Sequence, residues 1–439
     1  MSIQGYQKTV LPNGFEVHTH RLEGVRKAYL EVRVKAGSYD EPEGQTGVAH
    51  YLEHMHGYGS LKFPEVEFLP PFIDEGGDFN MTTSNNWTNY WRLALPHKIP
   101  RFLEVVSDVL ANSVFDQNHV DKEREPILVE QEEASANLDS RLALSLDGLL
   151  YPRHKLSVPV IGFRPDISRM NYEMLNAFKT RYYRASNMFL VATGDVDHQQ
   201  YVDMAEEYFG GMPLLDKLPE LKPIYPVSGS FHNPENHGVT QLKLGFPVSA
   251  RGSKTELTDI YASHIVARKI FDELRLKRKL LYTPKSGINH SPYASFFEVT
   301  SNVSPQNLRA SLEAVLDVLE DVYLNISEED IQVLKNQEEE SILDDVIDPK
   351  KVGEILAAGI QERGEYISFE SYADALNKMT VDDVKQFIRR LIVVDPFLAV
   401  SGPADDVPEI IPLIKGLRNK MGLQTSATDA SLGKHFRAN

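Results

Sequence analysis

The chain lacks cysteine altogether, has only two tryptophans among its 439 residues, and contains no long apolar run. Without cysteine, no disulfide framework can stabilise the fold, and any metal site must use His, Asp or Glu. No stretch approaches about eighteen consecutive apolar residues, which argues against a membrane-spanning helix. The start has no basic segment followed by an apolar one, so we expect no secretory signal. We therefore expect a cytoplasmic protein, or one whose targeting segment has been trimmed.

Basic residues are scarce relative to acidic ones: 46 Lys and Arg stand against 63 Asp and Glu, giving a formal net charge of −17. A nucleic-acid-binding protein normally presents a basic surface, so this partner class is disfavoured. An acidic chain can attract basic ligands, although solubility alone explains the charge equally well. At 439 residues, the chain is too long for one ordinary domain and long enough for two or three buried cores.

An internal repeat divides the chain into two copies of one unit of about 200 residues. The segment Met170–Arg181 (MNYEMLNAFKTR) resembles Met379–Arg390 (MTVDDVKQFIRR), about 209 residues later. Three further pairs recur in the same order: LEVVSDVL (103–110) with LEAVLDVL (312–319), Gln-Glu-Glu at 131–133 and 337–339, and FLVATG (189–194) with FLAVSG (397–402). Four ordered matches indicate a duplication.

Each copy combines strand-like and helix-like sequence without regular βαβ alternation. Alternating segments such as YLEVRVKAG (29–37) and TQLKLGFPV (240–248) predict strands, and long amphipathic helices follow. We expect an α+β fold of two homologous domains, each a mainly antiparallel sheet with helices packed on one face. A proline-rich join predicts domains at 1–215 and 230–439, with a linker at 216–229.

The segment TGVAHYLEHMHG (46–57) contains two candidate metal-binding histidines and a glutamate beside them. His50 and His54 are four residues apart, so on a helix their imidazoles project from one face. Glu53 lies beside them and can accept a proton from a metal-bound water, whose pKa zinc lowers towards about 7. This His-x-x-Glu-His order is the inverted form of the common zinc-protease helix. The second copy reads YASHIVARKI (261–270) at the corresponding place, so the fold itself does not require the histidine pair.

A catalytic zinc needs a third protein ligand and an open position for water. The helix-like run 121–138 (DKEREPILVEQEEASANL) is the candidate source. Glu123 and Glu130 are two helical turns apart and share a face, so one can bind metal while the other holds a ligand histidine. Spacing alone does not rank the candidates, which are Glu123, Glu125, Glu130, Glu132 and Glu133.

Taken with their order along the chain, these motifs resemble the pitrilysin/insulinase family of zinc peptidases, in the short branch that includes mitochondrial processing peptidase. The likeness runs nearly end to end. It is carried by TVLPNGFEV (9–17), VKAGSYDEPEGQTGVAHYLEHM (34–55), GGDFNMTTSNNWTNYW (76–91), VATGDVD (191–197) and EEYFGGMP (206–213). The resemblance implies a zinc metalloendopeptidase that hydrolyses peptides or unfolded segments, with Glu53 as the catalytic base.

The resemblance also implies the remaining site residues. The family's Glu-Arg-x-x-x-x-x-Glu pattern falls on Glu123 and Glu130, which implies Glu130 as third ligand and Glu123 as its supporting carboxylate. Pro126 lies between them, and an interior proline is expected to kink the helix. FDELRLKRKLLY (271–282) is similar to the substrate-holding stretch, which implies Arg275 and Tyr282 as groups that bind the substrate carbonyl. Lys279 stands where this stretch usually has glycine.

An edge strand for the substrate is implied at Asn80, Met81 and Thr82, with Met81 in place of the usual alanine. By the same resemblance, residues 1–215 form the zinc-binding catalytic domain, and residues 230–439 form a substrate-binding domain without the zinc motif. Longer relatives enclose substrate with four such domains, so this chain is expected to bind one Zn²⁺ and to pair with a second chain, as a homodimer or with an inactive relative. Manganese or cobalt could use the same ligands.

Two rivals remain open at this point. Some family members are non-catalytic structural or peptide-holding subunits of processing-peptidase-like complexes, but such subunits usually lose the metal set that this chain retains. Alternatively, the enzyme class holds but the task differs, with specific presequence processing in place of the clearance of small peptides. Cleavage of a single site in a full-length precursor would distinguish the two tasks.

Overall fold

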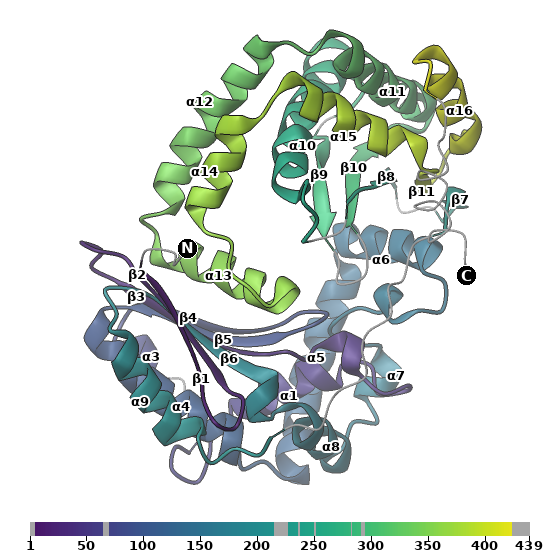
Figure 1. The fold of residues 1–439 in the computed structure, drawn as a ribbon. Helices are drawn as coiled ribbons and strands as arrows, with labels where there is room; N and C mark the ends of the chain where they lie inside the picture. Colours follow the sequence, from purple (N-terminus) through teal and green to yellow (C-terminus); the bar gives the residue numbers. More distant parts are fainter. Residues whose placement is uncertain are drawn as a thin grey trace. The chain divides into compact units, whose positions relative to one another are not determined.

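The computed structural model describes residues 5–64, 70–214, 227–235, 238–249, 252–281, 283–290 and 295–423. They form two compact units, each built from segments that are distant in the sequence (Figure 1). Unit 1 takes its described residues from Met1–Asn137, Val158–Glu220 and Leu343–Ser368. Unit 2 takes them from Leu138–Ser157, Leu221–Ile342 and Phe369–Asn439. None of the described helices is long and apolar enough to cross a membrane.

A six-stranded sheet forms the middle of unit 1, in the order β1-β2-β6-β3-β5-β4. Neighbouring strands are antiparallel except β2 and β6, which are parallel. The strands are β1 (Tyr6–Val10), β2 (Glu16–Arg21), β3 (Ala28–Val34), β4 (Asp78–Thr83), β5 (Thr88–Ala94) and β6 (Met188–Gly194). The helices are α1 (Val48–His56), α3 (Pro70–Asp74), α4 (Ile99–Asn112), α5 (Gln117–Ala136), α7 (Arg164–Ile167), α8 (Tyr172–Tyr182), α9 (His198–Phe209) and α13 (Pro349–Arg363).

Both faces of this sheet are covered, which explains why all seven residues of β3 are buried. Leu30 and Val32 join the main core of the unit, where residues of α1, α4, α8 and α9 also pack. The alternate side chains lie on the other face: there the buried carboxylate of Glu31 accepts hydrogen bonds from Tyr29 and Arg33 at 2.7 and 2.5 Å. That second face is covered by α13 (Figure 1).

Unit 2 repeats the plan with a five-stranded sheet in the order β7-β11-β8-β10-β9. Here only β7 and β11 are parallel neighbours. The strands are β7 (Gly229–Asn233), β8 (Thr240–Pro247), β9 (Lys285–His290), β10 (Ser295–Val303) and β11 (Phe397–Ser401). The helices are α6 (Leu138–Leu150), α10 (Glu256–Phe271), α11 (Leu308–Asn325), α12 (Glu328–Asp345), α14 (Phe369–Lys378), α15 (Val381–Val393) and α16 (Ile410–Lys420).

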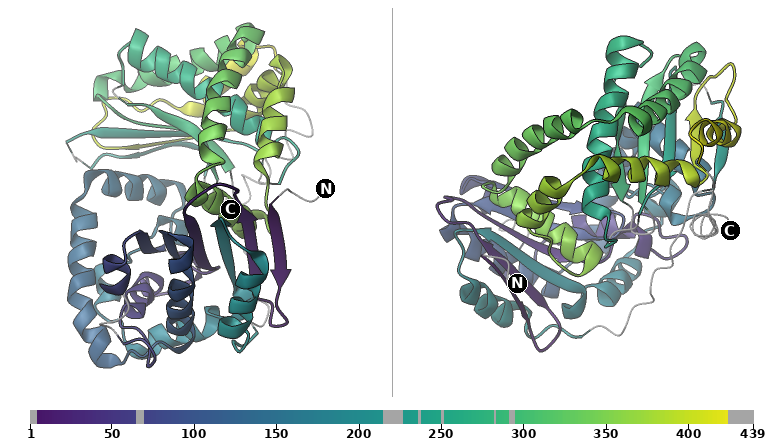
Figure 2. Two further views of the ribbon diagram at one scale, coloured as in Figure 1. Left: turned by 90° about the vertical axis from the view of Figure 1, so that its left-hand side faces the viewer. Right: turned by 45° about the horizontal axis from the view of Figure 1, so that its top comes forward.

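The strand orders of the two sheets match, apart from the additional edge strand β1 in unit 1. The predicted α+β class, with two homologous halves and mainly antiparallel sheets, is therefore confirmed. One feature was not predicted: besides the helices on its main face, each sheet carries one helix on its second face, α13 in unit 1 and α6 in unit 2 (Figure 2).

These two helices are exchanged between the halves of the sequence. Leu146 and Leu150 of α6, from the first half, pack on Phe296 and Phe397 of unit 2. Leu356 and its neighbours on α13, from the second half, pack on the β6 strand of unit 1. The predicted boundaries at 215 and 230 follow the sequence repeat, whereas the compact units differ from them at 138–157 and 343–368. Most of the predicted linker, residues 216–226, lies outside the described residues.

The contact between α13 and β3 depends on a glycine. A Cβ atom on Gly353 would lie 2.3 Å from Cδ1 of Tyr29, whose ring is held by the hydrogen bond to Glu31. We expect Gly353→Ala to lower the free energy of unfolding by about 1–3 kcal/mol, because the overpacking outweighs the better helix propensity of alanine. Gly416→Ala in α16, where nothing lies within 4 Å, is the matched control and should be stabilising by about 0.5–1 kcal/mol. Urea unfolding of both variants checks this, and a stabilised Gly353→Ala would contradict it.

Candidate metal centre and active site

Helix α1 presents two histidines because its start is fixed by the backbone. The helix follows Gly47, whose φ of 88° is favourable only for glycine and whose Cβ would lie 2.4 Å from the carbonyl oxygen of Ile161. The buried carboxylate of Glu41 accepts hydrogen bonds from the backbone N–H groups of Gly47 and Ala49, at 2.9 and 3.1 Å. These bonds satisfy N–H groups that a helix start otherwise leaves unpaired. The helix is therefore well anchored before its first ligand residue.

Helix α5 supplies the glutamates. The Asp116 side chain caps its start by accepting a hydrogen bond from the His119 N–H at 3.0 Å, and the helix continues across Pro126 to Ala136. The Tyr51 hydroxyl of α1 donates to the carbonyl oxygen of Val120 at 2.5 Å, which ties the two helices together. Despite the interior proline, Glu123 and Glu130 both face the histidines of α1.

Three side chains converge in a way that fits a metal ion. His50 Nε2 lies 3.6 Å from Glu130 Oε1, and His54 Nε2 lies 3.5 Å from Glu130 Oε2. One nitrogen of each histidine and one oxygen of Glu130 all lie within 4.8 Å of one another. Atoms bound tetrahedrally at about 2.0–2.2 Å from one zinc ion lie about 3.3–3.6 Å apart, so this donor set suits zinc. Among the described residues, no other group of three possible ligands comes together.

Glu123 holds His54 from the side opposite Glu130. Its Oε1 lies 3.0 Å from His54 Nδ1, and its Oε2 accepts a hydrogen bond from the Tyr58 hydroxyl at 2.9 Å. This contact fixes the imidazole so that its other nitrogen, Nε2, is directed towards Glu130. Tyr58 was not among the predicted residues, because nothing in its spacing from His54 points to a shared carboxylate.

The electrostatics of the two histidines differ. Burial, with a smaller contribution from His54, lowers the pKa of His50 to about 4, so that its imidazole is neutral and can offer a lone pair. Burial would also lower the pKa of His54, but hydrogen bonds to Glu123 and Glu130 outweigh it and raise that pKa to about 9. A protonated His54 cannot offer the lone pair of Nε2 to a cation, so metal binding is expected to release that proton.

Glu53 lies beside this group but outside the ligand set. The residue is 8% exposed, and its Oε2 accepts a hydrogen bond from the Thr83 hydroxyl at 2.5 Å. Burial raises the pKa of Glu53, partly offset by the bond from Thr83. A carboxylate in this position can accept a proton from a neighbouring water. The sequence pattern did not single out Thr83, since its contact with Glu53 spans thirty residues of chain.

The predicted substrate strand is an edge strand. Asn80, Met81 and Thr82 lie on β4, which is at the end of the sheet and, among the described strands, pairs with β5 alone. Met81 packs against the main core, and the same strand brings Thr83 to Glu53. Strand β4 therefore brings one of its side chains to the carboxylate that would act as base.

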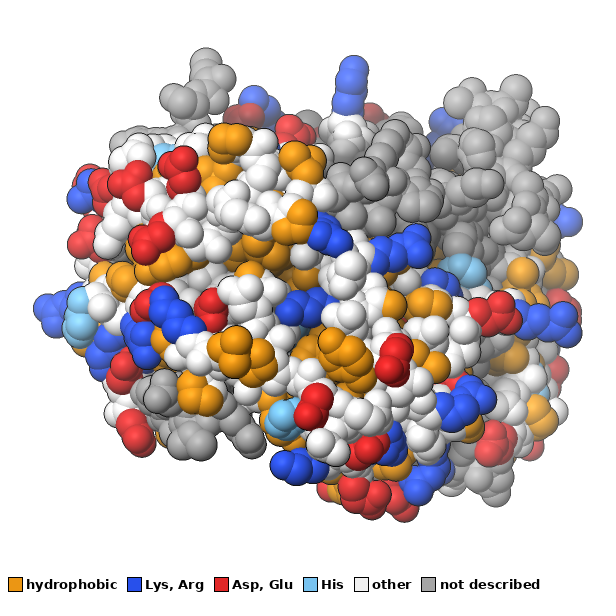
Figure 3. Space-filling view, turned by 90° about the horizontal axis from the view of Figure 1, so that it is seen from below, with side chains coloured by type: hydrophobic (Ala, Val, Ile, Leu, Met, Phe, Trp, Pro, Cys, Tyr) orange, Lys and Arg blue, Asp and Glu red, His pale blue; other side chains and the backbone are white. Residues whose placement is uncertain are grey.

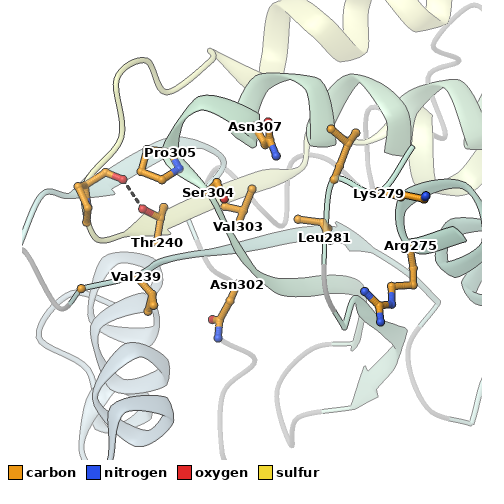
Figure 4. Close-up of a pocket in the computed structure, with 13 residues that line it drawn as sticks. Val239, Thr240, Arg275, Lys279, Leu281, Asn302, Val303, Ser304, Pro305 and Asn307 are labelled. Atoms are coloured by element: carbon orange, nitrogen blue, oxygen red, sulfur yellow. Dashed lines mark hydrogen bonds between the residues drawn. The ribbon is translucent and has the colours of Figure 1, made fainter. Parts of the chain in front are cut away.

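Arg275 lies in unit 2, in a π-helical segment (Asp272–Lys277) that follows α10, where it lines a pocket of about 450 Å³ (Figure 4). Tyr282 lies outside the described residues, so its placement stays a prediction. In the second copy, α10 carries His264, which pairs with Glu338 at 2.7 Å. No second histidine lies on α10 (Glu256–Phe271), so this described helix has no counterpart of the pair formed by His50 and His54.

Comparison with known proteins identifies the family. Residues 16–162 match the model described as "Insulinase (Peptidase family M16)", and residues 169–338 match "Peptidase M16 inactive domain". The chain belongs to peptidase family M16. The resemblance to the pitrilysin/insulinase family is thereby confirmed, and membership of this family supports a peptidase in general terms.

Relatives in this family carry consistent names. A protein of Rickettsia felis named "Uncharacterized zinc protease" is 24% identical over 92% of this chain and 98% of its own length. The mitochondrial-processing peptidase subunit beta of Saccharomyces cerevisiae is 29% identical over 48% of this chain and 46% of its own length.

Solved structures share the fold. A protease from Helicobacter pylori superposes with a TM-score of 0.79 at 19% identity, covering 91% of this chain and 99% of that one. A chain of Complex III2 from Candida albicans gives 0.78 at 14% identity, covering 94% and 99%.

The Glu123 contact predicts a measurable effect on metal affinity. We expect Glu123→Gln to weaken zinc binding by about 10–100-fold, because the amide holds the His54 ring less firmly than the carboxylate does. Glu125→Gln, an exposed position two residues along the same helix, is the control and should bind zinc as the wild type does. Competition with a chromophoric chelator measures both affinities. Equal affinities of the two variants would show that Glu123 does not orient the ligand.

Proposed function

We propose that this chain is a zinc metalloendopeptidase that hydrolyses peptides or unfolded segments. The observation that carries the proposal is the convergence of His50, His54 and Glu130 in unit 1, with Glu53 buried beside them but outside the donor set. The names of the zinc-protease relatives support the same metal. When bound, zinc supplies Lewis acidity that makes a water molecule acidic near neutral pH.

In this proposal each site residue has a separate role. His50, His54 and Glu130 hold the ion, and Glu123 orients His54 through its hydrogen bond. Glu53 accepts a proton from the attacking water; its raised pKa brings its basicity closer to working pH. The Thr83 hydroxyl, bonded to Oε2 of Glu53, restricts rotation of that carboxylate. A base held in one orientation needs less reorganisation when the proton moves.

Extended peptide is the substrate that the edge of β4 suits. Backbone groups of Asn80, Met81 and Thr82 can pair with an added strand, so that affinity comes from main-chain hydrogen bonds. The net charge of −17 favours basic peptides. On the face drawn in Figure 3, the described Lys and Arg side chains are interspersed with Asp and Glu, which gives no support for nucleic acid as a partner.

A second chain is part of the proposal. The described part of the chain holds one candidate metal set and one candidate substrate-holding stretch, with Arg275 in unit 2, so two copies would supply two of each. We propose a homodimer that encloses the substrate, and pairing with an inactive relative is the alternative. The fold similarity to a chain of Complex III2 supports assembly with other chains as a general property of this fold.

A non-catalytic role is the second candidate function. It is favoured by the fold similarity to a chain of the Candida albicans Complex III2, which is a multi-chain assembly by its title. Against it stands the complete set of metal-binding side chains and the buried base. A chain that only held peptides or other subunits would not need Glu53 to be separated from the ligand set.

The test of the proposed mechanism is Glu53→Gln. We expect this variant to keep about one zinc per chain and to lose cleavage of a quenched basic peptide by about 10²–10⁴-fold, because the base is removed while the ligands remain. Glu43→Gln, at an exposed position before α1, controls for the loss of one charge and should be unaffected. Full activity of Glu53→Gln would exclude Glu53 as the base.

Two Thr83 variants complete this series. Thr83→Ser keeps a hydroxyl group beside Glu53 and should retain most of the wild-type kcat. Thr83→Val removes the donor and should lower kcat about tenfold with little change in KM, since the hydrogen bond orients the base and does not bind peptide. If the two variants behaved alike, the bond from Thr83 would have no part in the reaction.

A further inference from the structure

Unit 2 contains a pocket of about 450 Å³ whose charged lining is entirely basic (Figure 4). Arg275 and Lys279 lie at one end, Leu281 and Val303 lie in the middle, and Thr240 at the start of β8 lies at the other end. Polar side chains from Asn302, Ser304 and Asn307 also line it, and no Asp or Glu does so among the described residues. This composition is unexpected in a chain with a net charge of −17.

The basic residues beside this pocket fall into two groups. Lys277 pairs with Glu273 at 3.0 Å, and Arg278 pairs with Glu273 at 2.7 Å and with Asp317 at 2.9 Å. Neither Lys277 nor Arg278 lines the pocket. Lys279 does line it, and forms no ion pair with any described residue. Among the described residues, the ion pairs of this segment therefore involve the two basic side chains outside the pocket, and none involves Lys279.

Lys279 also has a backbone conformation that favours glycine. Its φ is 55°, in the left-handed region. Among the described residues, Lys279 is one of only two non-glycine residues with a positive φ. It follows the π-helical segment, where the N–H of Leu280 bonds back to the carbonyl oxygen of Leu274 at 2.8 Å. A helix end closed in this way usually has glycine at the left-handed position. A lysine in this conformation lowers the stability of the backbone relative to glycine. Such strained residues are frequent at functional sites.

We infer that this pocket binds a carboxylate group of a peptide substrate, with Lys279 as its main cationic partner. The ammonium and guanidinium groups of Lys279 and Arg275 offer only donors, which suits an acceptor such as a carboxylate. The apolar middle suits an adjoining aliphatic side chain, and about 450 Å³ is within the range of small-ligand sites. The inference rests on the proposed function in that it names a feature of the same substrate. The carboxylate is either the C-terminus of the peptide or an acidic side chain.

The experiment measures binding of labelled peptides to the full-length Glu53→Gln chain in buffer that contains zinc, because this variant is expected to bind substrate without turnover. Three pentapeptides of one sequence are compared: a free C-terminus, an amidated C-terminus, and an amidated form with one Gln replaced by Glu. We expect one of the two carboxylate peptides to bind about tenfold tighter than the amidated Gln peptide, as for a charge-assisted hydrogen bond. Which of them does so identifies the source of the carboxylate.

Variants at Lys279 then locate the effect. Lys279→Gln should abolish the preference for the carboxylate peptide, and Lys279→Arg should retain most of it. Lys277→Gln removes the same charge two residues away, outside the pocket, and should leave the preference unchanged. Lys279→Gly should raise the thermal unfolding midpoint while losing the preference, which separates the binding role from any damage to the fold.

Several results would overturn the inference: no binding of any peptide, equal binding of all three, or a preference that persists in both Lys279→Gln and Lys279→Gly. The last result would place the carboxylate elsewhere, for example on the metal ion. The proposed function fails separately. If the wild type bound no zinc and cleaved nothing, while the Lys279-dependent preference remained, the pocket would stand and the peptidase proposal would not.

Discussion

The packing of α1 against α5 is the constraint on which the candidate site depends. Tyr51 ties the two helices through the carbonyl oxygen of Val120, and Glu123 reaches across to the ring of His54. With the helices held so, Glu130 lies 3.6 and 3.5 Å from the two histidines. A shift of about 1 Å between the helices would change these separations by more than zinc ligation tolerates. The anchoring of α1 at Gly47 and Glu41 serves the same geometry from the other end.

The local part of the site could be predicted from the sequence, and the distant part could not. His50, Glu53 and His54 lie within two helical turns, so helical periodicity alone puts them together. The third candidate ligand lies on a helix about seventy-five residues away, and spacing left five glutamates open until the family resemblance favoured Glu130. Thr83 and Tyr58 act through single hydrogen bonds to Glu53 and Glu123, and no sequence pattern marks such contacts.

The fold shows the same limit. The duplication and the sheet patterns predicted two homologous α+β halves, because strand alternation and repeat spacing are properties of the sequence itself. The exchange of α6 and α13 depends on which sheet face each helix reaches, and that is decided by packing: Leu146 against Phe296 in one unit, and Leu356 against Val191 in the other. Each half of the sequence therefore supplies one helix to the unit built mainly from the other half, and that helix covers the second face of the sheet there.

The central claim, that this fold positions a catalytic zinc, is tested most directly by metal content measured with activity. Elemental analysis of purified wild type and His50→Ala, with a quenched basic peptide assayed on the same samples, gives both quantities together. The account predicts about one zinc per chain in the wild type, and loss of metal and cleavage together in the variant. A wild type that held no metal after zinc supplementation and cleaved nothing would contradict it and favour the non-catalytic role.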